Sequence, residues 1–394
     1  MTGRIVATFN VGSSSIKLAA YGSAQSGGLG PRLLRAELAG LPDTPKLTAT
    51  AGSGDRARAF LAGADISDLR LSVLAPQLVM AMEAALDQPL VAVGHRVVQG
   101  GRHNHASRTA TPELIAELET LCPLAPDHQP HNLAAIRAVN AARPDLPQTL
   151  SFDTAFHRTQ PRIAQMYALP RAMMDSGILR YGYHGLSYAH IARHLPEHFP
   201  AHRQQRTLAL HLGSGSSLCA ILNGRSIAAS MGFSALSGIP MATRCGDIDP
   251  GLLLYLMSER HMSVDDVSQM LRKQSGLLGV SGISGDLRQL EAAGTAEAEE
   301  AIELFIYRTV RECGSHISAL GGIDALVFTG GVGEHSWRAR AGIAAGLEWA
   351  GIRIDTDANR QGATLLSPPG SPVSVFVLPA DEESEIARDC LALL

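Results

Sequence analysis

The stretch that decides the fold is Ile5-Val-Ala-Thr-Phe-Asn-Val-Gly-Ser-Ser-Ser-Ile-Lys-Leu-Ala-Ala20. Its first part, residues 5–9, is a short apolar run that is typical of a buried strand. The run breaks at residues 10–15, where Gly12 permits backbone angles closed to other residues. Amide and hydroxyl groups at this break can bind an anion, and Lys17 adds a positive charge just beyond it. On its own, the stretch fits a plain Ser-rich hairpin and an anion-binding turn equally well.

The same pattern returns in the second half of the chain. An apolar strand at 207–212 leads into Gly213-Ser-Gly-Ser-Ser217, and a second apolar run follows at 218–222. Asn223-Gly224 then predicts a tight hairpin. Chance produces such an echo fairly often in Gly-rich chains. Taken as real, it predicts two related α/β domains that each present a phosphate-binding turn to one central cleft.

Length and composition bound the class of protein. A chain of 394 residues exceeds one typical core, so we predict domains at 1–150 and 151–382, with a last helix at 383–394 packing back on the first. A formal net charge of −4 argues against a general nucleic-acid binder. Five widely spaced cysteines lack zinc or redox spacing, and no apolar run has the length of a membrane span. These features predict a protein with no nucleic-acid or membrane partner and a cytoplasmic location.

Further segments predict the elements between the two turns. Helical periodicity covers 66–86 and a long amphipathic helix lies within 291–320, whereas 89–94 and 373–378 read as strands. The apolar run 325–329 enters a third glycine turn at 330–334, and a helix is expected from about His335. Asp381-Glu-Glu383 predicts the start of the last helix.

Charged and polar side chains gather in several glycine-rich, otherwise apolar segments. Taken singly, Arg96 and Arg244 each fit a structural salt bridge, and His128, His184 and His211 each fit a satisfied core residue. Together, two arginines, a histidine, an acid and phosphate turns fit phosphoryl transfer, which needs mainly positioning and charge stabilisation. Magnesium prefers oxygen ligands, for which Asn10, Asp153, Glu382 and Glu383 are candidates.

Motifs in order along residues 5–388 resemble the acetate kinase family, within the larger group of sugar kinases, Hsp70 and actin. They are Phe9-Asn-Val-Gly-Ser-Ser-Ser-Ile-Lys, Gly94-His-Arg-Val-Val-Gln-Gly-Gly, Phe152-Asp-Thr-Ala-Phe-His, Arg180-Tyr-Gly-Tyr-His-Gly, Thr243-Arg-Cys-Gly-Asp-Ile-Asp-Pro, Phe328-Thr-Gly-Gly-Val-Gly-Glu and Asp381-Glu-Glu. The resemblance implies two ribonuclease H-like (actin-like ATPase) domains. It also implies a homodimer that transfers a phosphoryl group reversibly between ATP and acetate with Mg²⁺, for which Mn²⁺ can substitute.

The resemblance also implies roles for individual residues. Asp153, Arg96, His184 and Arg244 would be catalytic, and Asn10 and Glu382 would hold the metal. The carboxylate site would be formed by Arg96, Val98, His128, Tyr183 and Ala235. Nucleotide and phosphate would be bound by Ser15, Lys17, His211, Leu212, Gly213, Ser214, Gly215, Asp286, Leu287, Arg288, Gly331, Val332, Gly333, Glu334 and His335. A carboxylate acceptor is already anionic, so we assign Asp153 to metal and geometry control rather than to proton removal.

Several residues depart from the family pattern. Gln99 replaces a usual His, and Ser214 and His335 each replace an Asn, which bears on nucleotide preference. Asp127 stands where an apolar residue is usual, Tyr183 where Phe is usual, and Ala235 where Pro is usual. Ala235 would widen the acyl pocket, so propionate is the alternative substrate.

Two other functions remain open at this point. A kinase of a hydroxylated substrate such as a sugar would need a general base, and Asp153 could serve. An actin-like protein that only binds nucleotide would keep the phosphate turns without needing Arg96, His184 and Arg244. The paired arginines favour an anionic acceptor.

Overall fold

The computed structural model describes residues 3–12, 15–25, 27–198 and 205–394, and divides them into two compact units. Unit 1 comprises residues up to Phe156 together with Asp381–Leu394, and unit 2 comprises His157–Ala380. The division falls after Phe156 rather than at residue 150, because strand β7 (Gln148–Phe152) pairs with strand β5 (Ala92–Val97) in the sheet of unit 1. Asp153 therefore belongs to unit 1 and not, as predicted, to the second domain.

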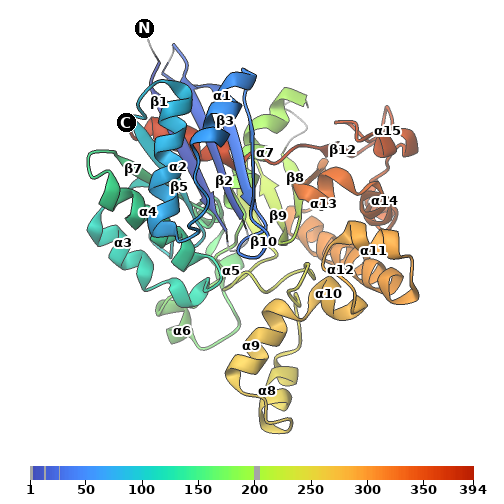
Figure 1. The fold of residues 1–394 in the computed structure, drawn as a ribbon. Helices are drawn as coiled ribbons and strands as arrows, with labels where there is room; N and C mark the ends of the chain where they lie inside the picture. Colours follow the sequence, from blue (N-terminus) through green and yellow to red (C-terminus); the bar gives the residue numbers. More distant parts are fainter. Residues whose placement is uncertain (1–2, 13–14, 26, 199–204) are drawn as a thin grey trace. The chain divides into compact units, whose positions relative to one another are not determined.

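The sheet of unit 1 has seven strands in the order β4-β3-β2-β1-β5-β7-β6 (Figure 1). The remaining strands are β1 (Ile5–Val11), β2 (Ser15–Ser23), β3 (Leu29–Ala39), β4 (Lys46–Thr50) and β6 (Arg108–Thr109). The helices are α1 (Gly54–Gly63), α2 (Leu71–Leu86), α3 (Pro112–Glu119), α4 (Gln129–Ala142) and α16 (Glu382–Ala392), with a 3-10 turn at Cys122–Leu124. Strands β1 and β2 are antiparallel, whereas β1, β5 and β7 are parallel neighbours.

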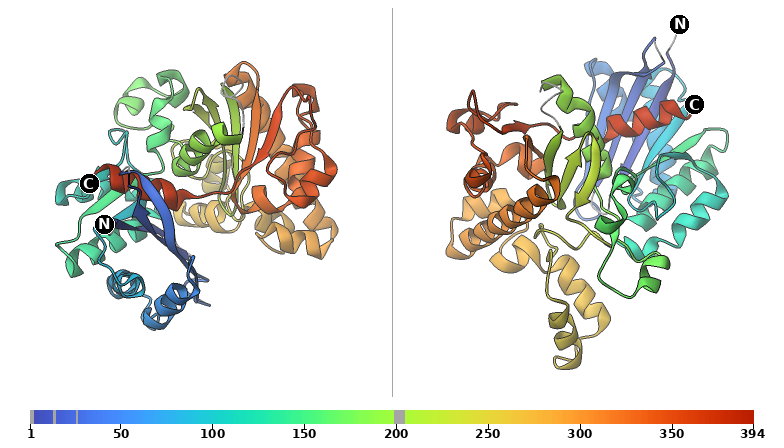
Figure 2. Two further views of the ribbon diagram at one scale, coloured as in Figure 1. Left: turned by 90° about the horizontal axis from the view of Figure 1, so that it is seen from above. Right: turned by 180° about the vertical axis from the view of Figure 1, so that it is seen from behind.

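Alternation along β1 sends side chains to two cores. Ile5, Ala7 and Phe9 pack with helices α1, α2 and α4 on one face of the sheet. Val6 packs with Ala387 and Cys390 of α16 on the other face, where α16 crosses the strands (Figure 2). The last helix thus completes the core of unit 1.

The sheet of unit 2 has five strands in the order β10-β9-β8-β11-β12. They are β8 (Arg206–Leu212), β9 (Ser216–Leu222), β10 (Arg225–Ala229), β11 (Ala325–Thr329) and β12 (Ser374–Val377). The helices are α5 (Arg162–Gln165), α6 (Arg171–Asp175), α7 (Gly185–His198), α8 (Pro250–Ser258), α9 (Val264–Lys273), α10 (Gly276–Ser281), α11 (Leu287–Ala293), α12 (Ala296–Leu320), α13 (Gly330–His335), α14 (Trp337–Ala345) and α15 (Thr356–Gln361). Two 3-10 turns lie at Ala155–Thr159, where the units join, and at Glu348–Ala350.

The main core of unit 2 lies between the sheet and α12. Leu208 and Leu210 of β8 pack with Ile302 and Phe305 of α12. The alternate residues of β8, such as Thr207, point to the other face of the sheet, toward α7. Helices α8 and α9 extend away from this sheet (Figure 1).

The two sheets share one topology. In each, the first strand lies between its antiparallel hairpin partner and a parallel strand, so β3-β2-β1-β5-β7 corresponds to β10-β9-β8-β11-β12. The echo between residues 5–20 and 207–222 is therefore a repeated hairpin, β1–β2 and β8–β9, at the same place in both sheets. This repeat confirms two related α/β domains.

Two predicted elements differ from the structure. Helix α2 begins at Leu71 rather than residue 66, because the carboxylates of Asp65 and Asp68 accept the amides of Ser67 and Arg70 and favour turns. The third glycine turn, at 330–334, is itself helical, because α13 begins at Gly330, and the helix expected from about His335 is α14, which begins at Trp337. Within the described residues, no helix combines the length and apolar character needed to cross a lipid bilayer.

Candidate active site

In unit 1, polar side chains gather where parallel strands end. Asn10 is the next-to-last residue of β1, Arg96 is the next-to-last residue of β5, and Asp153 directly follows β7. Carboxyl ends of parallel neighbours meet at one edge of a sheet, where such folds place ligands. Glu382 joins them as the first residue of α16.

Arg96 lies at the centre of this group. Its guanidinium donates two hydrogen bonds to the Asp153 carboxylate, from Nε at 2.9 Å and from Nη2 at 2.6 Å. Nη1 donates to Oδ1 of Asn10 at 3.1 Å, and Nδ2 of Asn10 donates to Oε2 of Glu382 at 2.9 Å. The side chain of Asp153 is only 1% exposed, so the pair is a buried, bidentate contact of the strong kind.

The group holds more acidic than basic side chains, because the carboxylates of Asp153 and Glu382 both face the single guanidinium of Arg96. Burial by itself would lower the pKa of Arg96, but the carboxylates of Asp153 and Glu382 raise it above its ordinary value. Burial raises the pKa of Glu383, and repulsion from Glu382 adds to this. Arg96 is thus a permanent cation in a buried, oxygen-rich setting.

The start of α16 is fixed by Asp381, which the sequence predicts, and by Tyr21 and Arg32, which the sequence did not single out. Asp381 accepts the amide of Ser384 as the N-cap, and its carboxylate also accepts hydrogen bonds from Tyr21 Oη at 3.3 Å and Arg32 Nη1 at 3.2 Å. These contacts set where Glu382 lies. Tyr21 and Arg32 lie in ordinary strand positions, and no sequence pattern predicts that they contact Asp381, about 350 residues away in the chain.

The described residues of the opening turn adjoin this group through the β1–β2 hairpin. Lys17 lies opposite Asn10 in the β1–β2 register, and the carbonyl of Ser15 accepts the Gly12 amide at 2.8 Å. Ser13 and Ser14 lie outside the described residues.

The predicted acyl-site residues of unit 1 follow β5. Val98 is buried, and its amide donates to Oδ1 of Asn132 at 3.1 Å. His128 is the N-cap of α4, and Asp127 before it is half-buried. Gln99 is fully buried, and its Oε1 accepts the Gly101 amide at 2.9 Å, so it shapes the backbone of this loop.

In unit 2, two glycine turns lie against each other. The segment Gly213–Gly215 follows β8, and α13 follows its parallel neighbour β11. Gly330 has a φ of +78°, and a Cβ there would lie 2.7 Å from the Leu212 carbonyl oxygen, so only glycine fits. The second and third glycine turns of the sequence are thereby brought together.

Two histidines stack beside the first of these turns. The rings of His184 and His211 are 4.3 Å apart and 22° from parallel. Nδ1 of His184 lies 2.8 Å from Ser217 Oγ, and Nδ1 of His211 lies 2.9 Å from Ser187 Oγ. Ser217 was missed in the sequence, although it is the cross-strand partner of His211 in the β8–β9 register.

Arg244 reaches the same turn. A Cβ on Gly215 would lie 2.8 Å from Arg244 Nη2 and 3.3 Å from His184 Nε2, so both side chains converge on this glycine. Arg244 Nη1 also donates to the carbonyl of Ala235 at 2.8 Å. Tyr183 is buried, and its hydroxyl donates to the carbonyl of Phe233 at 2.8 Å.

The other predicted nucleotide residues are arranged more loosely. Asp286 caps α11 and forms an ion pair with Arg288, which is largely exposed. Leu287 is part of the core. The Glu334 carboxylate accepts the amides of Gly330 at 3.1 Å and Ala380 at 3.0 Å. Val332 is half-buried, and exposed positions are occupied by Ser214, Gly331 and His335.

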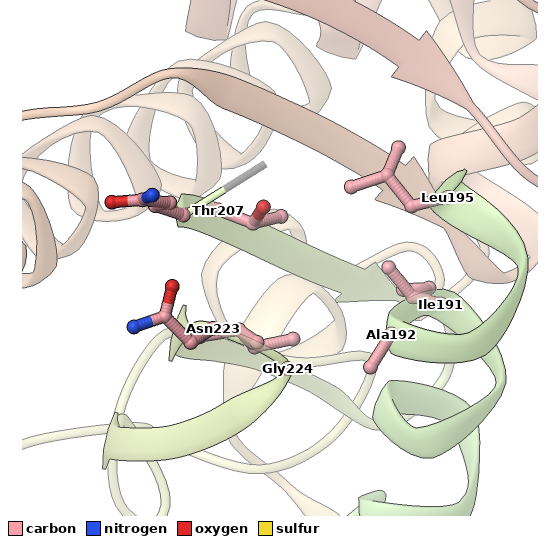
Figure 3. A pocket seen from close by; sticks show the side chains of 8 residues that line it. Ile191, Ala192, Leu195, Thr207, Asn223 and Gly224 are labelled. Carbon is pink, nitrogen blue, oxygen red and sulfur yellow. The ribbon is translucent and has the colours of Figure 1, made fainter. Parts of the chain in front are cut away.

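A cavity of about 120 Å³ in unit 2 lies apart from these residues (Figure 3). Ile191, Ala192 and Leu195 of α7 line one side, and Thr207 at the start of β8 and Asn223-Gly224 after β9 line the other. It therefore lies at the opposite end of the β8–β9 hairpin from Gly213–Gly215 and contains none of the predicted site residues.

The two groups differ in the chemistry that they offer. Unit 1 offers a cation and hard oxygen ligands, and unit 2 offers an arginine, two imidazoles and glycine-rich backbone of the kind that binds phosphate. Positive charge and backbone donors stabilise a transferring phosphoryl group.

The whole chain matches known proteins. Residues 5–388 match the sequence model of the Acetokinase family. An acetate kinase of Methylocella silvestris is 45% identical over 398 residues, which cover 99% of this chain and 98% of that protein. Two solved structures align over nearly their full length: an acetate kinase of Porphyromonas gingivalis (34% identity, TM-score 0.81, 99% of both chains) and a propionate kinase of Francisella tularensis (30% identity, TM-score 0.83, 98% of both).

Proposed function

The chain belongs to the acetokinase family, and on that premise we propose that it transfers the terminal phosphoryl group of ATP to acetate, forming acetyl phosphate and ADP reversibly. The observation that carries this proposal is the buried contact of Arg96 with Asp153 and Asn10. A fixed guanidinium binds a planar carboxylate well, whereas a neutral hydroxyl acceptor gains little from it.

The acceptor needs no general base. A carboxylate is already ionised at neutral pH, so the main barrier is the repulsion between two anions. Arg96 in unit 1 and Arg244 with His184 in unit 2 supply the opposing charge and donors. Asp153 holds the Arg96 guanidinium through two hydrogen bonds, which supports a role in geometry control.

Magnesium fits the donor set of unit 1. The side-chain oxygens of Asn10 and Glu382 are hard ligands of the type that Mg²⁺ prefers, and they would hold the ion, with Mn²⁺ as a substitute. When bound, the ion supplies further positive charge to the phosphate oxygens. Asn10 keeps Glu382 oriented through its amide, and Arg96 keeps Asn10 oriented through Oδ1.

Acetate is the first acceptor and propionate the alternative. The small Ala235 favours a roomy acyl site, and a relative of known structure is named a propionate kinase. A hydrophobic pocket distinguishes one methylene by only about 1–3 kcal/mol. Both acids are therefore expected to react.

One assay tests the proposal against its rivals. The protein is incubated with ATP and Mg²⁺ and with acetate, propionate, butyrate or glucose, and acyl phosphate is trapped with hydroxylamine. Hydroxamate from acetate or propionate is the expected result. Glucose-dependent ADP release without hydroxamate would instead identify a sugar kinase, and nucleotide binding without turnover would identify a binding protein.

We further propose a cytoplasmic homodimer. All five cysteines are unpaired thiols, which fits a reducing compartment. Helix α8 supports self-association because it exposes large apolar side chains. None of its residues is buried, and Leu252, Leu254 and Tyr255 are among the exposed ones. A second copy of the chain is the occupant expected from the family.

A further inference from the structure

We propose that His157 is a positioning residue for His184, acting through the main-chain carbonyl of Tyr183. The inference rests on the proposed function, in which His184 contacts the transferring phosphoryl group. His157 lies in the 3-10 turn Ala155–Thr159, is fully buried, and is not among the residues that the family resemblance marks as functional.

The hydrogen bonds of His157 define its tautomer. Nε2 lies 2.8 Å from the carbonyl oxygen of Tyr183, and a carbonyl only accepts, so Nε2 carries the proton. Burial lowers the pKa of His157 to about 3, so the ring is neutral and Nδ1 is an acceptor. The hydroxyl of Ser226, 2.9 Å from Nδ1, must then donate to it.

Two neighbours complete this chain of donors. Ser226 Oγ accepts from Gln160 Nε2 at 3.0 Å and from Cys219 Sγ at 3.3 Å. Since Ser226 gives its only proton to His157, both contacts must donate to it, and the thiol fits because burial raises the pKa of Cys219 to about 12. The hydrogen bonds therefore run in one direction, ending at the Tyr183 carbonyl.

The backbone at this carbonyl is unusual. Gly182 has a φ of +76°, and a Cβ there would collide with Cγ of His157, so the ring packs directly against the glycine. His184 has a φ of +56°, which is uncommon for a residue other than glycine. The Tyr183 carbonyl belongs to the peptide that joins Tyr183 to His184. The bond from His157 fixes that peptide and, with it, the direction in which His184 leaves the backbone.

His157 and His184 are also connected through a series of side-chain contacts. The rings of Tyr188 and His157 form a T-shaped contact with their centroids 5.6 Å apart. The Tyr188 hydroxyl lies 2.6 Å from Ser217 Oγ, which lies 2.8 Å from His184 Nδ1. His157 thus supports His184 both through its backbone and through the hydroxyl that orients its ring.

A double-mutant cycle measures this coupling. We would compare wild type, His157→Leu, His184→Ala and the double variant in the hydroxamate assay. His157→Leu is expected to lower kcat about 30-fold with both KM values within about twofold, because a small displacement of a group that acts in the transition state affects kcat. His157→Gln, whose amide can still donate, should recover most of the rate.

The cycle separates positioning from packing. If His157 acts through His184, the double variant is as slow as His184→Ala alone, whereas multiplied losses would overturn the proposal. His316→Gln is the matched control, because His316 is also buried and neutral in unit 2, and its kcat should match wild type.

A measurement on the wild-type protein tests the proposal even if the variants fail to fold or have no activity. Ring ¹⁵N shifts of His157 should show the Nε2-H tautomer from pH 5 to 9, and a proton on Nδ1 would overturn the proposal. These shifts can be recorded even if wild type forms no acyl phosphate, a result that would reject the proposed function alone.

Discussion

At the residue scale, Arg96 links stability and activity in unit 1. Its guanidinium is shared between Asp153 and Asn10, and its side chain is only 12% exposed. Removing one partner of a buried ion pair leaves the other charge desolvated, which costs about 3–5 kcal/mol. The same guanidinium is the group that we expect to face the acceptor carboxylate.

Substitutions at Arg96 should separate these two effects. Arg96→Ala should lower both the free energy of unfolding and turnover, the latter by roughly a hundredfold or more. Arg96→Met with Asp153→Leu should recover much of the stability but none of the turnover, because an apolar pair can replace a buried ion pair. Urea unfolding and the hydroxamate assay measure both quantities. Normal turnover in either variant would show that Arg96 does not act on substrate.

Buried histidines should make stability depend on pH. Burial lowers the pKa of His316 to about 4, whereas in the unfolded chain it is about 6.5. The unfolded state therefore binds the extra proton as pH falls below 6.5, and the free energy of unfolding decreases. Between pH 7.5 and 5.5 the loss is roughly 1 kcal/mol for this histidine.

The variant His316→Gln isolates the contribution of His316 to the pH dependence of the free energy of unfolding. Urea unfolding of His316→Gln should show a pH-dependent loss roughly 1 kcal/mol smaller than that of wild type. His95 and His157, with pKa values lowered by burial to about 4 and about 3, should add further losses in the same direction. An unchanged slope in the variant would contradict the burial argument.

At the element scale, the turn after β8 should tolerate no added side chain. Gly215→Ala would place a methyl group 2.8 Å from Arg244 Nη2, which is the far end of a flexible side chain. The fold should therefore persist while Arg244 is displaced, lowering kcat by roughly tenfold to a hundredfold. Gly52→Ala is the control, because a Cβ there meets open space. Equal rates in both variants would contradict the placement of Arg244 at this turn.

Sequence patterns predicted the elements whose signals are local. The hairpins at 5–20 and 207–222 follow from apolar runs broken by glycine and serine, and both are present with residues 13 and 14 left undescribed. The convergence of Asn10, Arg96 and Asp153 also follows once their strands are known to be parallel neighbours. Contacts such as Asp381 with Tyr21 and Arg32 could not be predicted, because they join segments distant in sequence with no pattern connecting them.

At the scale of the whole molecule, a substitution on the exposed face of α8 tests whether two copies of the chain associate. Its Leu254 side chain is 69% exposed, and a large exposed apolar surface is a common mark of an interface. Leu254→Asp should convert a dimer into a monomer, measured by analytical ultracentrifugation, with little change in unfolding free energy at low protein concentration. The exposed Met80→Asp in unit 1 is a control that should remain dimeric. A monomeric wild type would reject the proposed dimer.

Because unit 1 is built from two separate segments of the chain, it can complete its fold only at the end of translation. Unit 2 is one continuous segment, whereas unit 1 lacks α16 until residues 381–394 have been made. At roughly 5–20 residues per second, the ribosome needs about 10–45 s to translate residues 157–380 after unit 1 begins to emerge. For that interval the nascent sheet has one uncovered face, which is a natural substrate for chaperones. A chain released early would also lack Glu382, so incomplete translation products are expected to be both aggregation-prone and inactive.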